Sequence, residues 1–121
     1  MAQGDCFPKA VQVLDELLAD DLDAYLVHGL PVYLGDGEPD GPDGRFHHAW
    51  VEVDHGDWVE VHDLSNDREV RMDRDLYYAV GNVTPEEHTT EFDRVSASWQ
   101  MVEFGHYGPW DGSVPPVREA L

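Results

Sequence analysis

The sequence predicts an α+β fold in which an N-terminal, cysteine-bearing helix packs on an antiparallel β-sheet. Between residues 5 and 19, apolar side chains recur at intervals of three and four, which is the spacing of a helix with one buried face. Two strand-like segments, 46–53 and 57–63, are separated by a short polar turn and would pair as antiparallel neighbours. The 121 residues suffice for one domain, expected over residues 1–110, with residues 111–121 as an exposed C-terminal tail.

The first helix has a defined start. Asp5 can cap its N-terminus, and Pro8 falls in the first turn, where a missing N–H costs little. Cys6 is therefore expected at the first helical position. The stripe predicted to be buried consists of Phe7, Ala10, Val11, Leu14, Leu17 and Leu18.

The next segment is apolar and partly β-branched over residues 25–34, which predicts a strand that Gly29-Leu30-Pro31 would interrupt. Residues 35–44 (GDGEPDGPDG) have the composition of a polar loop. This loop precedes the central strands directly and is expected to border any site that they carry.

The turn between the two central strands predicts their register. If His55 and Gly56 are the two turn residues, with Gly56 at positive φ, residue 54 pairs with 57 and residue 48 pairs with 63. His48 and Asp63 would then be direct cross-strand neighbours, with Cβ atoms about 5 Å apart. His47 would face the other way, because side chains alternate along a strand.

The second half of the chain predicts shorter elements. Residues 64–67 (LSND) are typical of a turn, and Asp73 can cap a helix over 74–80 that ends at Gly81. Residues 89–95 predict a further strand. Ser96 can cap a helix over 97–104 that Gly105 stops.

The charge of the chain is strongly one-sided. It has 26 acidic and 7 basic residues, a formal net charge of -19, and Lys9 is the only lysine. Such a surface repels phosphates and anionic lipid, so neither nucleic acid nor a membrane is an expected partner. The scarcity of lysine beside so many aspartates favours a protein of a salt-adapted organism or its virus, because multimolar salt screens self-repulsion to a few ångströms.

The location expected from the sequence is a reduced cytoplasm, of high salt if the source is a halophile. No stretch is long and apolar enough to span a membrane, and the N-terminal residues lack the pattern of a signal peptide. A single cysteine, moreover, allows no internal disulfide.

Cys6 is the candidate nucleophile. The thiolate is the reactive form of cysteine, and the N–H groups and partial positive charge of a helix N-terminus favour it. A histidine that takes the thiol proton and an acid that fixes the tautomer of that histidine complete a Cys-His-Asp hydrolase. The candidate catalytic residues are therefore Cys6, His48 and Asp63, and this chemistry needs no cofactor.

A metal cluster of His47, His55 and His62 is the alternative constellation. Its spacing matches no zinc signature, and the three side chains would not share one face of the predicted hairpin. We therefore expect no metal site.

The residues around the candidate triad resemble the transglutaminase-like branch of the papain-like cysteine hydrolases. The resemblance spans residues 4–66, and its most specific part is His48-Ala49-Trp50-Val51-Glu52, followed about a dozen residues later by Asp63. The other matching strings are Gly4-x-Cys6, Leu26-Val27-His28-Gly29 and Asp63-Leu64-Ser65-Asn66. Further along, Tyr77-Tyr78 and the ending His106-Tyr107-Gly108-Pro109-Trp110 are similar to small, often phage-borne members.

The resemblance implies a papain-like core with Cys6 as nucleophile, His48 as general base and Asp63 as its orienting acid. The implied reaction is acyl transfer at an amide or ester, as protease, deamidase or transferase, on a peptide or other amide-containing substrate. The chain departs from the family in its short length and in lacking a glutamine at the usual wider spacing before the cysteine. A catalytically silent papain-like module, for binding or for structure and of viral origin, is the alternative function.

Overall fold

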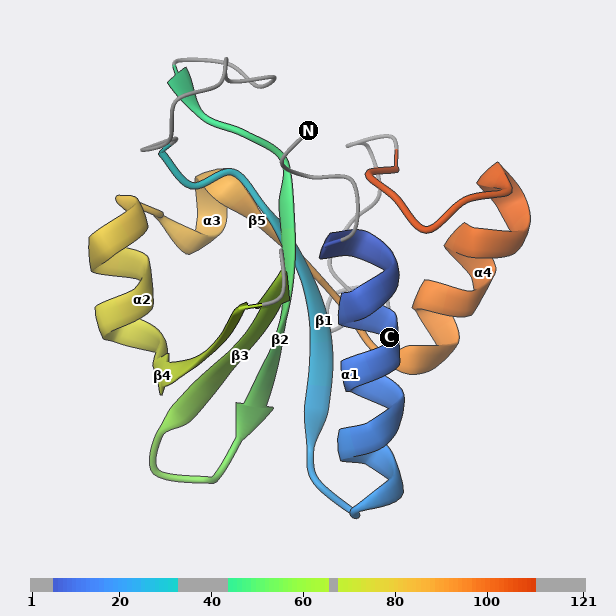
Figure 1. The fold of residues 1–121 in the computed structure, drawn as a ribbon, viewed down its shortest axis with the longest axis horizontal. Coiled ribbons are helices and arrows are strands. Elements are labelled where there is room, and N and C mark those ends of the chain that lie inside the picture. Colours follow the sequence, from blue (N-terminus) through green and yellow to red (C-terminus); the bar gives the residue numbers. More distant parts are fainter. Residues whose placement is uncertain (1–5, 33–43, 66–67, 111–121) are drawn as a thin grey trace.

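The computed structural model describes residues 6–32, 44–65 and 68–110, and they form an α+β fold (Figure 1). One N-terminal helix packs on a five-stranded antiparallel sheet with strand order β4-β3-β2-β1-β5, which confirms the predicted class. The elements in chain order are α1 (Cys6–Ala19), β1 (Ala24–Gly29), β2 (His48–Asp54), β3 (Val59–Ser65), β4 (Arg68–Asp73), α2 (Arg74–Gly81), α3 (Pro85–His88), β5 (Thr89–Phe92) and α4 (Arg94–Phe104).

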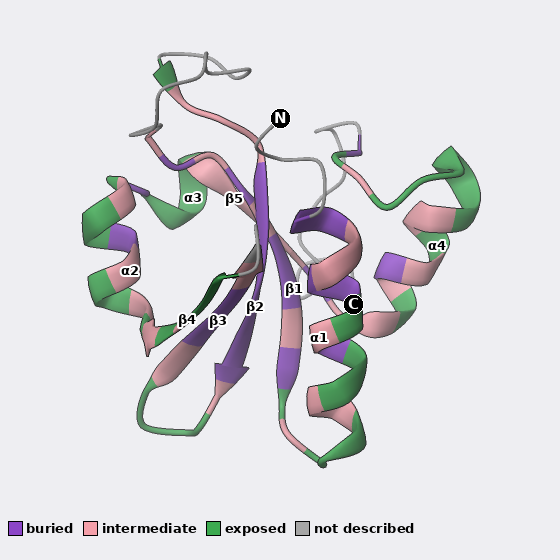
Figure 2. Cartoon of the chain, in the orientation of Figure 1, coloured by how far each residue is buried: buried purple, intermediate pink, exposed green. Residues whose placement is uncertain are grey.

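The sheet has a buried layer on each face. On one face, α1 packs against alternate residues of β2, with Ala49, Val51 and Val53 in the same apolar cluster as the helix. On the other face, Trp50 and Val61 pack against Tyr78 of α2. Figure 1 shows α1 and α2 on opposite sides of the strands, and Figure 2 shows the buried residues gathered in β1, β2 and the inner side of α1.

Helix α1 forms as predicted. It begins at Cys6 with Pro8 in the first turn, and the buried members of its stripe are Cys6, Phe7, Ala10, Val11 and Leu14. Leu14 is fully buried, so replacing it by alanine would cost about 2–5 kcal/mol of folding free energy. The cap expected from Asp5 lies outside the described residues.

The predicted register of the central hairpin is wrong by two residues. Val51 pairs with His62 and Asp54 pairs with Val59, so the turn holds four residues instead of two. The Asp54 carboxylate accepts a hydrogen bond from the Gly56 N–H at 2.8 Å, and the chain closes between the His55 N–H and the Trp58 carbonyl at 2.9 Å. These bonds stabilise the wider turn, in which Gly56 has the expected positive φ of 100°. A shift of two leaves every side chain on its predicted face.

Several element boundaries also differ from the prediction. Residues 64–65 belong to β3 rather than to a turn, and β3 continues into the unpredicted edge strand β4, whose REVRMD sequence has too few apolar residues to stand out. The last helix begins at Arg94, because the Asp93 side chain accepts from the Ser96 N–H at 2.8 Å and acts as the cap in place of Ser96. The short helix α3 was not predicted either.

Of the remaining predictions for where helices and strands begin and end, some are confirmed and others are not. Helix α2 has its predicted Asp73 cap, which accepts from the Asp75 N–H at 2.8 Å, and α4 ends at Gly105 with φ 76°. The first strand ends at Gly29, and beyond it Val32 forms only an isolated bridge with Arg45. The predicted loop over 35–44, except for its last residue Gly44, and the tail over 111–121 lie outside the described residues.

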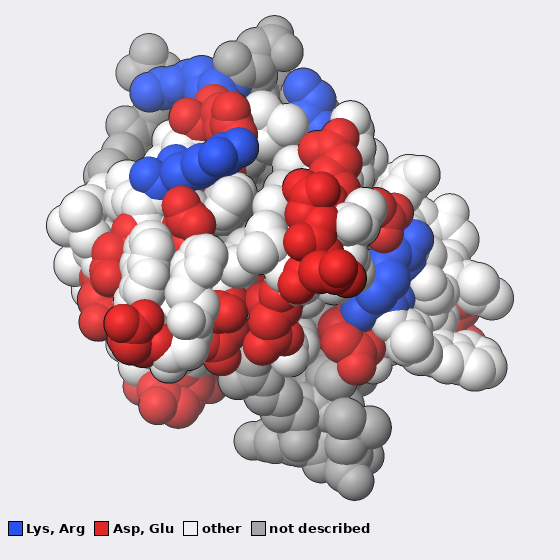
Figure 3. Space-filling model, turned by 90° about the horizontal axis from the view of Figure 1, so that it is seen from below, with Lys and Arg blue, Asp and Glu red and all other residues white. Residues whose placement is uncertain are grey.

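The surface reflects the acidic composition. Figure 3 shows Asp and Glu side chains spread over the face seen from below, with few cations among them. Among the described residues, no helix combines the length and the apolar character needed to cross a membrane.

Candidate active site

The candidate site forms where β2 and β3 separate. The last pair of their ladder is Val51 with His62, yet β2 starts three residues earlier at His48 and β3 extends three residues further to Ser65. Over these ends β2 pairs with β1, and β3 pairs with β4. Side chains near the split can therefore meet without a direct backbone pair between the two strands.

The structure brings Cys6, His48 and Asp63 together. His48 Nε2 lies 2.9 Å from Asp63 Oδ2, and each residue is only 8% exposed. The expected contact between the two is thus present, although it runs diagonally rather than between paired residues. The Cys6 side chain, from the first turn of α1, interacts with the His48 ring both as a hydrogen-bonding group and through its charge.

His48 is protonated at neutral pH in this environment. Burial disfavours the charged ring and lowers its pKa, but the hydrogen bonds with Asp63 and Cys6 and the charges of both groups outweigh burial and raise the pKa to about 9. His48 Nδ1 is buried and forms no hydrogen bond of conventional geometry with a described residue. The imidazolium is therefore stabilised by charge on two sides, from β3 and from α1.

Tyr77 is a member of the site that the sequence reasoning did not assign. Its hydroxyl donates to Asp63 Oδ2 at 2.5 Å, so one carboxylate oxygen receives hydrogen bonds from both Tyr77 and His48. Burial, and next the charge of Asp63, raise the pKa of Tyr77 far above its usual range, so the hydroxyl remains a donor at any working pH. The Tyr77-Tyr78 pair was visible in the sequence, but only the docking of α2 shows which carboxylate it faces.

A second buried carboxylate lies on the same face of the sheet. Glu52 is 3% exposed and accepts hydrogen bonds from the Trp50 indole N–H at 3.0 Å and from the Tyr78 hydroxyl. Arg74 Nη1 lies 3.7 Å from its other oxygen. These bonds join β2 to α2 and hold the helix that carries Tyr77.

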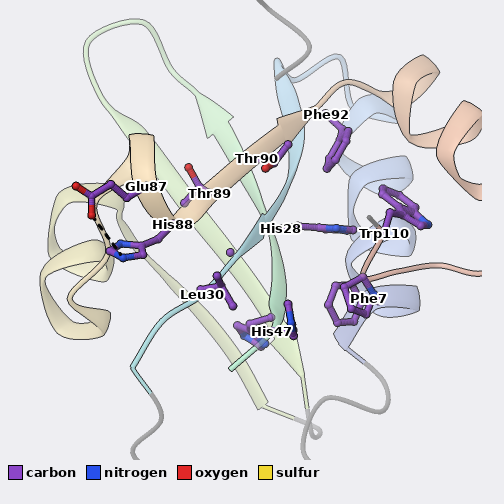
Figure 4. Close-up of a pocket in the computed structure, with 13 residues that line it drawn as sticks. Phe7, His28, Leu30, His47, Glu87, His88, Thr89, Thr90, Phe92 and Trp110 are labelled. Carbon is purple, nitrogen blue, oxygen red and sulfur yellow. Dashed lines mark ion pairs between the residues drawn. The ribbon is translucent and has the colours of Figure 1, made fainter. Parts of the chain in front are cut away.

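A cavity of about 200 Å³ adjoins the triad. Phe7, the residue after Cys6, and His48 both line it, and His28, Phe92 and Trp110 contribute aromatic walls (Figure 4). His47 lines the same cavity. His47 and His48 therefore border a common space, but among the residues described it is His48 that bonds to Asp63.

The remaining histidines form no metal centre in the described part of the chain. His55 Nε2 and His62 Nε2 converge on Glu60 Oε1 at 2.9 and 3.1 Å, while His47 lies apart from them at the cavity. No group of three or more His, Cys, Asp or Glu side chains that could hold a metal ion occurs within the described ranges. Burial acts to raise the pKa of Glu60, but the hydrogen bonds and charges of His55 and His62 outweigh it, and the pKa of Glu60 is lowered.

Comparison of the chain with protein-family models, with curated proteins and with solved structures finds no match. Functional proposals for this chain therefore depend on its own side-chain geometry.

Proposed function

We propose that this chain is a cysteine-dependent acyl hydrolase or transferase with a papain-like core of the transglutaminase-like kind. Cys6 would be the nucleophile, His48 the general base and acid, and Asp63 the residue that orients and charges the histidine. The observation that carries the proposal is the 2.9 Å bond between His48 Nε2 and Asp63 Oδ2, on a ring that also contacts the Cys6 side chain. A histidine held between an acid and a thiol is the arrangement that activates a cysteine.

The reaction would proceed in two acyl transfers. The Cys6 thiolate attacks the carbonyl carbon of an amide or ester, and the protonated His48 gives its proton to the departing amine or alcohol as the bond to the carbonyl breaks. Neutral His48 then takes a proton from water or from an acceptor amine, which attacks the thioester and releases Cys6. Backbone N–H groups in the first turn of α1, beside the sulfur, are the donors that we assign to the oxyanion.

Asp63 and Tyr77 would hold the histidine in the working state. Asp63 fixes the ring through Nε2, which would leave Nδ1 for the thiol, and the Tyr77 hydroxyl fixes the carboxylate in turn. Tyr77 touches neither substrate nor sulfur in this scheme, so it is a positioning residue. The substrate would be a peptide or another amide-containing molecule.

The alternative function is a catalytically silent module of the same fold, for binding or for structure and of viral origin. One observation favours it: Cys6 is fully buried, with 0% of its surface exposed. An inert structural cysteine is usually buried in this way, whereas a nucleophile must be reached by its substrate. For the hydrolase, the wall formed by Phe7 and His48 has to admit the substrate.

Labelling of native protein with iodoacetamide near neutral pH separates the two functions. Cys6 is the only cysteine, so a single adduct in the intact mass reports on it alone. The hydrolase predicts stoichiometric labelling faster than that of glutathione under the same conditions. The silent module predicts labelling no faster than the protein unfolds, a rate measured independently by dilution into denaturant.

An acyl-enzyme is the more specific product to seek. Treatment with 4-nitrophenyl acetate should acetylate Cys6 with release of one equivalent of nitrophenol, because the ester supplies the carbonyl and a good leaving group. The Cys6→Ala variant provides the control for acetylation elsewhere. Acetylation of the same extent in Cys6→Ala would exclude Cys6 as the nucleophile.

A high-salt setting is part of the proposal. The net charge of -19 is hard to reconcile with a compact fold at low ionic strength, since like charges within about 10 Å of one another remain unscreened at 0.1 M salt. We infer a protein that functions in concentrated salt.

A further inference from the structure

We propose that the cavity beside His48 binds an uncharged aromatic group of the substrate, adjacent to the carbonyl that Cys6 attacks. This inference rests on the proposed function and adds the substrate class to it.

The first support is position. The cavity wall includes Phe7, which follows the nucleophile in sequence, and His48, its proposed base. A group that fills the cavity therefore lies against the proposed base His48 and against Phe7, the residue next to Cys6. The volume of about 200 Å³ is smaller than the roughly 300–1,000 Å³ of pockets for whole small molecules. It suits one side-chain-sized group, with the rest of the substrate outside.

The second support is the aromatic character of one end of the cavity. The His28 ring packs edge to face with Phe7 at a centroid distance of 4.9 Å, and it lies 4.5 Å from Trp110. Phe92 contacts both His28 and Trp110, at 5.2 Å in each case. Figure 4 shows these rings around His28. Aromatic side chains that line a cavity favour a further ring as partner.

The third support is the absence of charge at this end. His28 is half-buried, and its Nε2 atom, which is itself buried, has no hydrogen-bond partner among the described residues. Burial, and next the charge of His47, lower the pKa of His28 to about 3, so its ring is neutral at any working pH. Among the described residues that line the cavity there is no Lys or Arg, and Glu87 at its other end would repel an acid. A carboxylate at the aromatic end would therefore be buried without a cationic partner among the rings that form that end.

The aromatic end is also tightly built. A methyl group added at Gly108 would lie 2.7 Å from His28 Cε1 and 2.9 Å from Phe7 Cδ1. The segment that leads to Trp110 thus approaches both rings as closely as a backbone can. The ring positions are consequently fixed before a substrate arrives, which lowers the entropic cost of binding.

The test compares alkylating reagents that share one reactive group. Iodoacetamide, N-benzyl-iodoacetamide and its 4-carboxybenzyl analogue are reacted with native protein in concentrated salt, and each rate is divided by the rate with glutathione. We expect the benzyl reagent to gain about tenfold over iodoacetamide, equivalent to about 1.4 kcal/mol. The carboxybenzyl reagent should lose that gain, because its charge would be buried without a partner.

A pair of matched variants locates the effect. Thr90 lines the cavity and pairs with His28 across β1 and β5, so Thr90→Phe should fill the space and abolish the benzyl preference. Thr84 is exposed and lies outside the cavity lining, so Thr84→Phe should keep the preference. Iodoacetamide itself should label all three proteins at similar rates.

Failure of the aromatic subsite and failure of the proposed hydrolase give different labelling results. Rapid labelling by iodoacetamide with no benzyl preference overturns the aromatic subsite and leaves the hydrolase intact. A preference that persists in Thr90→Phe, or that the carboxybenzyl reagent shares, overturns it as well. Slow labelling by every reagent overturns the hydrolase, and the subsite falls with it. The comparison of reagents on unaltered protein decides the matter even if Thr90→Phe fails to fold.

Discussion

Two carboxylates are buried on the same face of the sheet, and consecutive tyrosines of α2 donate to them. Asp63 on β3 receives the Tyr77 hydroxyl, and Glu52 on β2 receives the Tyr78 hydroxyl. Both carboxylates are almost fully enclosed. By burial and by tyrosine contact alone, the two positions are nearly equivalent.

Their remaining partners differ. Asp63 bonds to His48, a group that can gain and lose a proton and that contacts Cys6. Glu52 bonds to the Trp50 indole and faces Arg74, neither of which exchanges a proton in the working range. A buried carboxylate thus becomes a candidate for catalysis when its hydrogen-bond partner is a side chain that can gain and lose a proton. Without such a partner, the same buried carboxylate serves to fix a helix on a sheet.

The largest expected contrast comes from neutralising each carboxylate. In Asp63→Asn the His48 ring loses the strongest interaction that raises its pKa, so this pKa should fall. Alkylation of Cys6 at pH 6.5 should then slow about tenfold for each unit by which the pKa of His48 falls. Glu52→Gln should leave alkylation unchanged and cost about 1–3 kcal/mol of unfolding free energy, through weakened bonds to Trp50 and Tyr78. Rates by mass spectrometry and denaturant titrations measure both. Equal slowing in the two variants would erase the distinction between the sites.

The pH dependence of stability should sharpen the contrast. The folded-state pKa of His48, about 9, lies above its ordinary value of 6.5, so the folded protein binds this proton more tightly. The resulting stabilisation, about 3 kcal/mol, is fully present below pH 6.5 and is lost as the pH rises through 9. Denaturant titrations from pH 6 to 9.5 on wild type and His48→Gln should converge toward the alkaline end. The pKa of Tyr78, beside Glu52, is raised above its usual range, so that cluster stays constant across the window.

A constant difference between wild type and His48→Gln across that pH range would contradict the elevated pKa. The Glu52→Gln variant is the matched control, since its difference from wild type should not vary with pH.

The two tyrosines offer a smaller and more local test. Tyr77→Phe and Tyr78→Phe each delete one hydroxyl from adjacent residues, and each should cost about 1–3 kcal/mol of stability, because a buried carboxylate loses a donor. Only Tyr77→Phe should shift the pH profile of Cys6 alkylation, since it frees the carboxylate that orients His48. A shift of the same size in Tyr78→Phe would show that α2 acts through general packing.

Salt should give the smallest effect at the two sites. Raising potassium chloride from about 0.1 M to 2 M shortens the range of repulsion between surface carboxylates, so the melting temperature should rise. The alkylation profile of folded protein should not change, because the Asp63 and Glu52 clusters are both buried. A melting temperature that is flat across this range would argue against salt adaptation.

The sequence predicts the His48–Asp63 contact because strand alternation is robust. The hairpin turn is two residues longer than expected, but a shift of two keeps His48 and Asp63 on one face, and the two side chains still meet. A shift of one would have separated them. The helix that carries Cys6 was likewise fixed by a local pattern, its apolar stripe with Pro8 in the first turn.

Features that depend on long-range packing were not predictable in the same way. Tyr77 belongs to the site because α2 packs over β3, and the strand β4 that leads into α2 has only two apolar residues, Val70 and Met72. Asp93 and Ser96 are both good capping residues, and local sequence alone does not rank them. The cavity depends on Phe92 and Trp110, which are distant from Cys6 in sequence.

The pH profile of Cys6 alkylation tests the central claim, activation of Cys6 by His48, most directly. Iodoacetamide rates are measured from pH 5.5 to 9.5 on wild type, His48→Ala and the neighbouring control His47→Ala, with unfolded samples to normalise intrinsic reactivity. A free thiol, with a pKa near 8.5, is only a few per cent ionised at pH 7. We expect wild type and His47→Ala to remain fast down to about pH 6, and His48→Ala to shift alkaline by a unit or more. Identical profiles for wild type and His48→Ala would contradict activation by His48 and leave the silent module as the function.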